Sequence, residues 1–234
     1  MAKLPAPTLH EAPGRRLWLA PGLEGEDPAA WLAGGVDALE QRAQQTGEGR
    51  VLGKGRGAAR ALRLGGRPGV WRHNRHGGAL GAWLADRYLS TVRLAREVAL
   101  STELRRAGVA TPEVLLALGE RRAGWVRQHL VTEEVVGAST VFEARDDEAA
   151  LAAADALLEQ VFELGLWATD LHPANLLWQP DPQHAQGGRC WIIDLAGAAM
   201  RLGPLRPQER AARRARFARY FQKHAGSVPA RFQA

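Results

Sequence analysis

Three polar side chains in the second half of the chain have the types and the spacing that phosphoryl transfer uses. Asp170 precedes Asn175 by five residues in the segment DLHPAN, and Asp194 follows 19 residues later in IIDLAG. In this chemistry one carboxylate orients the attacking hydroxyl, while an amide oxygen and a second carboxylate hold Mg²⁺ on the phosphates. The apolar stretches LLW and WII nearby favour this interpretation over a polar turn capped by Asp170.

A glycine-rich segment lies well before these acids. Gly53, Lys54, Gly55 and Gly57 fall between two predicted strands, and glycines there would let backbone amides approach phosphate oxygens. The same residues also suit an ordinary turn, so the segment alone is weak evidence. Its position ahead of the Asp/Asn/Asp set favours phosphate binding.

An ion pair is predicted between Arg72 and Glu97. Arg72 ends the predicted strand GVWR, and Glu97 lies on the side of the next helix where apolar residues recur at helical spacing. A carboxylate on a buried face needs a cation, which the neighbouring strand can supply. Kinase folds use such a pair to lock the cation that grips the α and β phosphates. Arg93, one turn before Glu97, is the local alternative partner.

The apolar and turn patterns predict the elements that must position these groups. Helices are expected over 28–45 after the capping residue Asp27, over 91–107 before Gly108, over 146–166 and over 207–225. Short strands separated by glycines are expected from residue 50 to the RHNRHGG turn, and two more around a turn at 121–124. Loop-to-strand and strand-to-loop segments are expected in TDLHPANLLW and RCWIIDLAG. This order indicates a two-lobed α+β arrangement.

The composition is that of a folded globular protein. The chain has 234 residues, of which 46% are hydrophobic and 24% charged. The single cysteine, Cys190, cannot form an internal disulfide, so a reducing compartment is expected. Prolines and charges interrupt any signal-peptide core near the N-terminus, and acids interrupt the most apolar stretch, 149–168, so neither a signal peptide nor a membrane span is expected.

The net charge of +6 is unevenly distributed along the chain. Residues 49–106 carry 13 basic and 3 acidic side chains, residues 107–200 carry 5 and 14, and residues 201–234 carry 9 and 1. This separation suggests a segment that handles anions followed by one that holds a metal. An Arg-rich composition without functional meaning is the alternative.

Several of these motifs, in their order and separation, resemble the 3-deoxy-D-manno-octulosonic acid (Kdo) kinase family of lipopolysaccharide kinases. The resemblance covers residues 50–220 and rests on KGRG, WRHNRHGGALGAWLADRY, AREVALSTELRRAG, TDLHPANLLW and CWIIDLAG. RHNRHGGALG with the following DRY is the specific part, because protein kinases and antibiotic phosphotransferases lack it. The resemblance implies a protein-kinase-like fold with an antiparallel-sheet N-lobe and a mainly helical C-lobe.

The resemblance also implies an activity and a location. The γ-phosphate of ATP would be transferred, with Mg²⁺, to the 4-hydroxyl of Kdo on a lipid A precursor at the cytoplasmic face of the inner membrane of a Gram-negative bacterium. The expected partners are this Kdo-lipid A precursor and the anionic membrane surface, with no nucleic acid. An N-terminal extension with one helix is expected over 1–48, the N-lobe over 49–132 and the C-lobe over 133–234.

Carried over position by position, the resemblance gives each candidate residue a role. Asp170 would be the catalytic base, and Asn175 and Asp194 would be the Mg²⁺ ligands. The residues that would hold the nucleotide are Gly53, Lys54, Gly55, Gly57, Arg72 and Glu97.

Departures from the family pattern affect the acceptor more than the chemistry. Arg72 replaces the lysine of protein kinases, which is tolerable because a guanidinium binds phosphates bidentately. Trp167 stands where many relatives have a histidine that braces the catalytic loop, so packing must brace it here. Ala196 takes the place of a second carboxylate, and His172-Pro173 is typical of aminoglycoside and choline phosphotransferases.

Two basic segments are candidates for binding the acceptor and the membrane. His73, Arg75 and His76 surround a glycine turn and could bind the carboxylate and phosphates of a lipid-linked sugar acid, or could serve structure alone. Metal binding by these histidines is disfavoured, because no ligand lies at a suitable spacing. The tail 207–225 is either a basic amphipathic helix that docks on an anionic membrane, or a solvated face with its aromatic residues packed inside.

Other functions are weighed on the same residues. DLHPAN favours a small-molecule phosphotransferase of the aminoglycoside or choline kinase type, which the short chain and RHNRHGG oppose. A pseudokinase or an anion-binding module is opposed by Asp170, Asn175 and Asp194 together. A serine/threonine protein kinase is least supported, because no activation segment with an APE-like anchor follows Asp194.

Overall fold

The chain forms two compact units. The computed structural model describes residues 4–45, 51–52, 59–75, 85–184 and 187–233. The first unit comprises Met1–Thr102 and Glu113–Glu134, and the second comprises Glu103–Pro112 and Val135–Ala234. The first unit thus ends two residues after the position 132 expected for the N-lobe, and it includes the N-terminal segment. Within the described residues, no helix is both long enough and apolar enough to cross a membrane.

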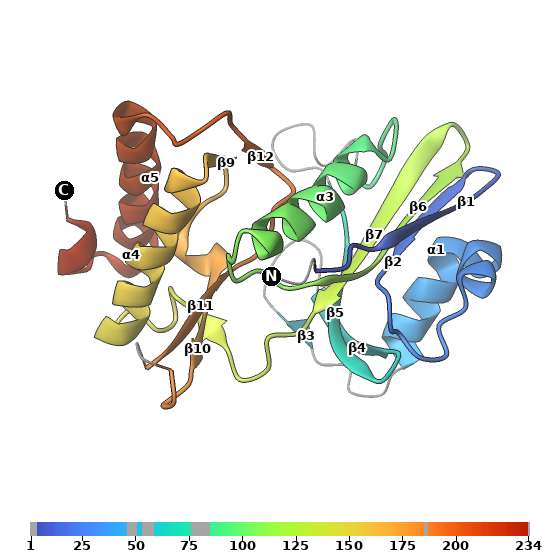
Figure 1. Cartoon of the computed structure of the whole chain (residues 1–234), viewed down its shortest axis with the longest axis horizontal. Helices are drawn as coiled ribbons and strands as arrows, with labels where there is room; N and C mark the ends of the chain where they lie inside the picture. The colour runs from blue at the N-terminus through green and yellow to red at the C-terminus, as the bar shows by residue number, and fades with distance from the viewer. Residues whose placement is uncertain (1–3, 46–50, 53–58, 76–84, 185–186, 234) are drawn as a thin grey trace. The chain divides into compact units, whose positions relative to one another are not determined.

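An antiparallel sheet of seven strands forms the framework of the first unit (Figure 1). Its strands lie in the order β1-β2-β6-β7-β5-β4-β3. Their bounds are β1 Thr8–Ala12, β2 Arg15–Leu19, β3 Val51–Leu52, β4 Ala59–Leu64, β5 Arg67–His73, β6 Val114–Arg122 and β7 Trp125–Glu133. The strands predicted after residue 50 and the hairpin predicted around 121–124 are therefore confirmed.

Strands β1 and β2 differ from the expectation of an extension with one helix. They pair with each other, and β2 pairs with β6, so the N-terminal segment belongs to the sheet. The side chains of β1 are mostly exposed, so this edge strand lacks the alternation that indicates a half-buried strand. β2 has five residues, RRLWL, whose last three are buried. Neither segment carries a periodic pattern long enough to predict.

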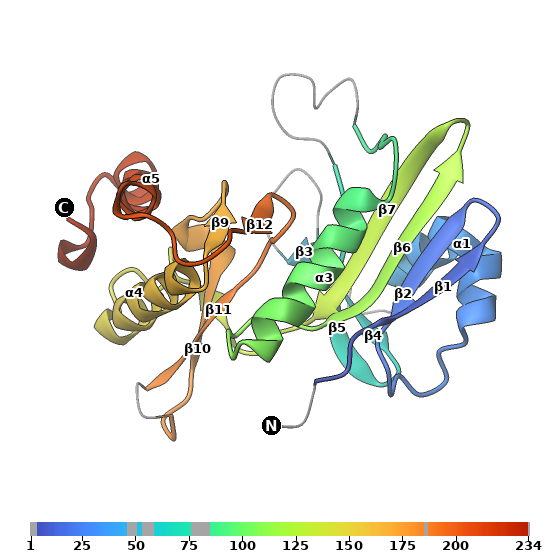
Figure 2. The same ribbon diagram turned by 45° about the horizontal axis from the view of Figure 1, so that its top comes forward.

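Helices cover both faces of this sheet (Figure 2). α1, Pro28–Gln45, packs on one face against Leu17 and Leu19 of β2. α3, Val92–Arg106, packs on the other face against Trp18. Successive residues of a strand point to opposite faces, so β2 contributes to two apolar clusters. The interior strand β6 is consequently buried on both faces over most of its length.

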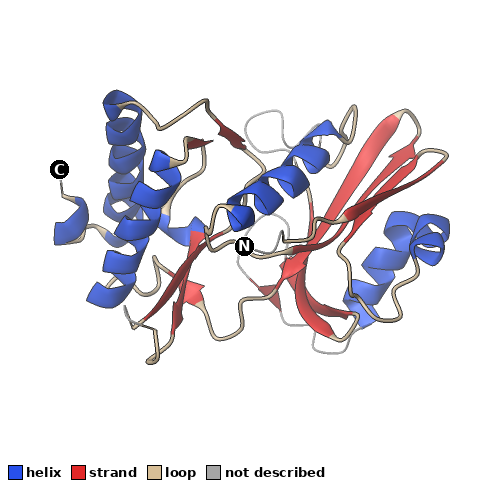
Figure 3. Cartoon of the chain, in the orientation of Figure 1, coloured by secondary structure: helices blue, strands red, loops and turns tan. Residues whose placement is uncertain are grey.

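Helices α4 and α5 and two small sheets build the second unit (Figure 3). The apolar core of this unit includes Phe162 of α4 and Phe217 and Phe221 of α5, all fully buried. The bounds of its elements are α4 Glu148–Glu163, α5 Pro207–Ala225, β8 Ser139–Thr140, β9 Leu166–Ala168, β10 Leu176–Pro180, β11 Gly188–Ile192, β12 Ala198–Met200 and the 3₁₀ turns η1 Pro173–Asn175 and η2 Ala230–Phe232. The sheet orders are β11-β10-β8 and β12-β9.

The predicted helices agree with the structure to within a few residues. α5 has the predicted bounds, and α3 ends just before Gly108, whose φ of 81° makes a left-handed stop. Asp27 caps α1 by accepting hydrogen bonds from two backbone amides of its first turn. α4 is shorter than predicted, because Gly165 at φ 84° turns the chain and Leu166 begins β9.

Candidate active site

Two strand pairs bring two loops together in the second unit. β10 pairs with β11 and β9 pairs with β12, in both cases antiparallel. The loop 169–175 joins β9 to β10, and the loop 193–197 joins β11 to β12. Since each loop begins at one strand pair and ends at the other, the two loops lie side by side.

Asp170, Asn175 and Asp194 lie in these two loops. The side-chain amide of Asn175 donates to the backbone oxygen of Asp170 at 2.8 Å. The backbone oxygen of Asn175 accepts from the amide of Ile193, next to Asp194, at 3.0 Å. The structure therefore brings together the three side chains that the sequence singles out. The Asp170 side chain is 60% exposed, so a substrate hydroxyl can reach its carboxylate.

The oxygens of Asn175 and Asp194 suit Mg²⁺. This ion takes oxygen ligands, and proteins hold it by one or two carboxylates together with substrate phosphates. Because the amide nitrogen of Asn175 donates to Asp170, the amide oxygen is the atom left for a metal. Asp194 has a left-handed backbone with φ 57°, a conformation that aspartate tolerates and that recurs at functional sites.

Helix α5 contacts the loop that carries Asp170. Arg216 donates to the Asp170 carboxylate at 3.0 Å. The ring of His172 stacks on that of Tyr220, with centroids 4.5 Å apart. Burial lowers the pKa of His172, so its ring is neutral at pH 7. These contacts join residues more than 40 positions apart, and no local sequence pattern signals them.

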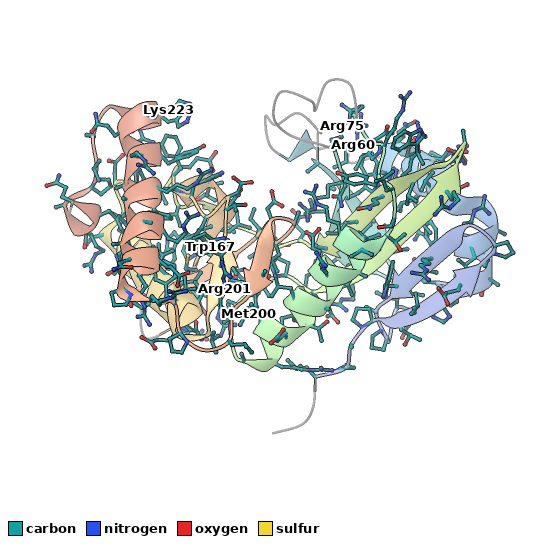
Figure 4. All side chains as sticks on the ribbon, turned by 90° about the horizontal axis from the view of Figure 1, so that it is seen from above. Arg60, Arg75, Trp167, Met200, Arg201 and Lys223 are labelled. Carbon is teal, nitrogen blue, oxygen red and sulfur yellow. The ribbon has the colours of Figure 1, made fainter. Side chains whose placement is uncertain are left out.

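Trp167 is braced by two arginines, one of which, Arg201, is labelled beside it in Figure 4. The guanidinium carbon of Arg213 lies 4.3 Å from a ring centroid of Trp167, and that of Arg201 lies 5.2 Å from it. Arg213 also donates to the backbone oxygen of Ala168 at 3.3 Å. Such cation–π contacts contribute about 0.5–2 kcal/mol each. These contacts pack Trp167 in place, as expected for a tryptophan that stands where many relatives have a bracing histidine.

The ion pair predicted between Arg72 and Glu97 is present in the first unit. Arg72 lies on β5 and Glu97 on α3, and their side chains are 24% and 3% exposed. Arg93, the alternative partner, instead donates to the hydroxyl of Tyr88 at 3.4 Å and lies over its ring. The buried carboxylate holds the guanidinium in place, which suits a cation that binds phosphates.

His73 is packed against His129 on the neighbouring strand. Their rings are stacked with centroids 4.2 Å apart and 16° between the planes. The Nε2 of His73 lies 3.3 Å from Asp86, and that of His129 lies 3.5 Å from Glu40. Burial lowers the pKa of both rings, to about 3 for His129. Arg75, two residues further on, is exposed.

The side chains of Glu40, His73 and His129 have ligand atoms within 4.8 Å of one another, which is close enough for a metal site. The ring geometry opposes one. A metal lies near the plane of each imidazole that binds it, and two stacked rings cannot both point at one ion. Trp71 also donates to Nδ1 of His129 at 3.1 Å, whereas a metal-bound histidine donates from its second nitrogen. The cluster therefore serves packing.

Five of the candidate residues fall where the structure gives no description. Gly53, Lys54, Gly55, Gly57 and His76 lie outside the described residues. Their roles stay predictions from the sequence.

A match to a protein-family model shows to which family the chain belongs. The model of the lipopolysaccharide kinase (Kdo/WaaP) family matches residues 41–227. The chain belongs to this family. This lipopolysaccharide kinase is thus a phosphotransferase with an alcohol group as acceptor.

A curated relative and two solved structures agree with this membership. A 3-deoxy-D-manno-octulosonic acid kinase of Photobacterium profundum is 29% identical over 173 residues, covering 70% of the kinase described here and 70% of the relative. WaaP in complex with acyl carrier protein has a TM-score of 0.56 at 20% identity, covering 88% of this chain and 80% of that chain. The Rio2 kinase-ADP/Mg²⁺-phosphoaspartate complex from Chaetomium thermophilum has a TM-score of 0.55 at 18% identity, covering 86% and 62%.

The two structural neighbours confirm the predicted fold. Both have the protein-kinase-like fold, and the antiparallel sheet with helices of this lipopolysaccharide kinase is α+β as expected. The kinase thus combines a buried Arg–Glu pair in one unit with an Asp/Asn/Asp set in the other.

Proposed function

We propose that this kinase transfers the γ-phosphate of ATP to the 4-hydroxyl of a Kdo residue on a lipid A precursor. The observation that carries the proposal is the convergence of Asp170, Asn175 and Asp194 on two adjoining loops. The name of the relative at 29% identity supports the Kdo acceptor. The Arg72–Glu97 pair supports the use of a nucleotide.

In the proposed mechanism Asp170 accepts the proton of the attacking hydroxyl. Its carboxylate is exposed, while its backbone oxygen is tied to the Asn175 amide, so the group is accessible and its loop is fixed. General base catalysis of this kind contributes about 10²- to 10⁴-fold to a rate. Asp170 also orients the hydroxyl, which reduces the entropy lost on reaching the reactive geometry.

Each unit contains residues that are candidates for binding the nucleotide or its metal ion. Arg72, fixed by Glu97, would bind the α and β phosphates. The segment Gly53, Lys54, Gly55 and Gly57 would line the phosphates with backbone amides. Asn175 and Asp194 would hold Mg²⁺, which neutralises negative charge on the phosphates when bound.

The acceptor contacts are proposed from the sequence. Arg75 is exposed two residues after the end of β5 and is suited to pair with an anionic group of the glycolipid. His76 would act beside it. His73, the third predicted contact, would act from a half-buried position in which its ring is stacked on His129.

We further propose that the kinase acts as a peripheral protein at the cytoplasmic face of the inner membrane of a Gram-negative bacterium. A glycolipid acceptor is embedded in a membrane, so the enzyme must meet it at the surface. The apolar side of α5 is not available for insertion, because Phe217 and Phe221 are fully buried within the second unit. Contact of α5 with an anionic surface would then rest on its charged side chains.

A small-molecule phosphotransferase of the aminoglycoside or choline kinase type is the second candidate. His172-Pro173 in DLHPAN favours it, since those enzymes share this loop. An acceptor screen with labelled ATP separates the two functions, because a phosphotransferase of that type would label aminoglycosides or choline in the absence of any glycolipid.

The role of Asp170 is tested by Asp170→Asn. Transfer from ATP to a Kdo-lipid acceptor should fall by about 10²-fold or more, while thermal stabilisation by ATP with Mg²⁺ is retained. Asp146→Asn is the matched control, because this exposed aspartate lies in the same unit and outside the two loops. Full activity of the Asp170 variant would show that another group is the base.

A further inference from the structure

The five arginines of α5 divide into two sets that face different partners. Arg210 pairs with Glu159 and Glu163 at 3.2 and 2.7 Å, and Arg214 pairs with Asp155 and Glu159 at 2.7 and 2.6 Å. All of these acids belong to α4. This first set joins the two helices and is neutralised within the unit.

The second set is a row formed by Arg213, Arg216 and Arg219. Residues three apart lie on one side of a helix, and this side of α5 faces the catalytic loop, because Arg213 contacts Trp167 and Arg216 contacts Asp170. The pKa of Arg213 is lowered, first by burial and then by the positive charges of Arg216 and Arg219. Arg213 is therefore close enough to both Arg216 and Arg219 to be repelled by their charges.

The acidic partner that the structure shows for this row is Asp170. Its carboxylate accepts a single hydrogen bond from Arg216, which has five N–H groups to donate. The Nε of Arg213 is buried and has no hydrogen-bond partner among the described residues. Neither an ion pair nor a hydrogen bond of the Arg219 side chain is found within that part of the chain. Three like charges beside one carboxylate form a site suited to an additional anion.

We propose that Arg216, flanked by Arg213 and Arg219, binds the carboxylate of the sugar-acid acceptor beside the hydroxyl that Asp170 activates. The inference rests on the proposed function and adds the residues that recognise the acceptor. In a 3-deoxy-2-ulosonic acid the carboxylate carbon C1 is three bonds from C4, so the anion and the reacting hydroxyl reach the protein together. A guanidinium that touches the base with one nitrogen can bind a carboxylate with the others.

A phosphate of the lipid could satisfy the same chemistry, but the position of Arg216 favours the carboxylate. Arg216 is in direct contact with the proposed base, so its ligand must lie within a few ångströms of the reacting hydroxyl. The acceptor carboxylate is on the same sugar as that hydroxyl, whereas the phosphates of a lipid A precursor are on a different sugar. The site thus discriminates a sugar acid from a neutral sugar.

The test compares a Kdo-lipid A precursor with its C1 carboxamide, at saturating ATP. Wild type should have a higher kcat/KM for the carboxylate by about 10- to 100-fold, the range expected for a charge-assisted hydrogen bond. Arg216→Gln should lose most of this preference, and Arg216→Lys should retain part of it. Arg206→Gln is the matched control, since Arg206 at the start of the same helix is 82% exposed, and it should discriminate as wild type does.

Other results would contradict either the carboxylate site at Arg216 or the proposed function. If wild type phosphorylates the Kdo acceptor and Arg216→Gln loses rate equally on both acceptors, Arg216 acts on the base or the nucleotide and the inference is wrong. An equal rate of wild type on both acceptors also contradicts it. If wild type shows no transfer to the Kdo acceptor, the proposed function itself fails. The unfolding transition of each variant shows that it is folded.

Discussion

At the scale of single residues, the candidate nucleotide-binding cation Arg72 is held in place by the buried carboxylate of Glu97. Glu97 is 3% exposed and holds Arg72, which is 24% exposed. Removal of one member of a buried pair leaves the other without compensation, and this costs more than the pair itself contributes. The Arg72–Glu97 pair is therefore the point in the first unit where a small change should alter nucleotide binding most.

Glu97→Gln should weaken ATP binding by about tenfold or more, which corresponds to about 1.4 kcal/mol. The amide keeps the shape of the side chain but removes the charge that orients Arg72. The dissociation constant of ATP with Mg²⁺, measured by calorimetry, reports the effect.

Glu103→Gln provides the control for this experiment, because Glu103 is an exposed glutamate on the same helix. It should bind ATP as wild type does. An unchanged ATP affinity in Glu97→Gln would contradict a nucleotide role for the pair.

Residue-scale prediction from sequence succeeds where the partner lies on a neighbouring element. Arg72 and Glu97 are joined by a strand-to-helix step, and the apolar spacing of the helix shows which face is buried. Arg216 and Asp170 are 46 residues apart, and their contact depends on how α5 packs in the second unit. The stacking of His73 on His129 depends on the register of β5 with β7. Such contacts have no local signature.

At the scale of elements, the histidine cluster beside α1 affects stability as well as packing. His129 is fully buried, and burial lowers its pKa from 6.5 to about 3. Its neighbours include Glu40, His73 and Arg127. The folded state keeps the ring neutral at a pH where the unfolded state binds a proton.

The first unit should therefore lose stability as the pH falls from about 6.5 toward about 3, by at most about 1.4 kcal/mol per pH unit from this one group. Above pH 6.5 the ring is neutral in both states and contributes no pH dependence. His129→Asn, which keeps an acceptor for Trp71, should reduce the slope in this window. Urea unfolding at a series of pH values measures it, and equal slopes for variant and wild type would contradict this origin.

Element prediction succeeds where a segment has a long period or a clear stop signal. α5 has its predicted bounds, and α3 ends before a left-handed glycine, because these helices carry capping and charge patterns over four or more turns. β9 and β12 have three residues each, too few for any periodicity. Yet the short strand pair β9–β12 fixes one end of each of the loops 169–175 and 193–197. The sequence therefore identifies Asp170 and Asn175 without showing which strands hold their loop in place.

At the scale of the whole molecule, part of the uneven charge distribution is explained by ion pairs within the second unit. The acidic segment 107–200 contains the α4 acids, and the basic tail contains the arginines that neutralise them. The sequence left open whether the aromatic residues of the tail insert into a membrane or pack inside the protein. Phe217 and Phe221 pack inside the second unit. The row Arg213, Arg216 and Arg219 is not paired with these α4 acids in the described part of the chain, so it is available to an external anion.

Binding of the kinase to vesicles with anionic lipid should consequently be sensitive to salt. Exposed charges interact over a Debye length of about 10 Å at 0.1 M salt and about 3 Å at 1 M, while an inserted apolar face would keep its affinity. Co-sedimentation should show binding at low salt that is lost near 1 M. Binding that persists at high salt would show that an apolar surface inserts.

The most direct test of the proposed transfer to Kdo is the identity of the phosphorylated product. Purified kinase, ATP with Mg²⁺ and a Kdo-lipid A precursor are incubated, and the product is analysed by mass spectrometry and by phosphorus NMR. We expect one added phosphate on the 4-hydroxyl of Kdo with wild type, and none with Asp170→Asn. A product phosphorylated on another sugar, or no phosphorylated glycolipid with the wild-type enzyme, would contradict it.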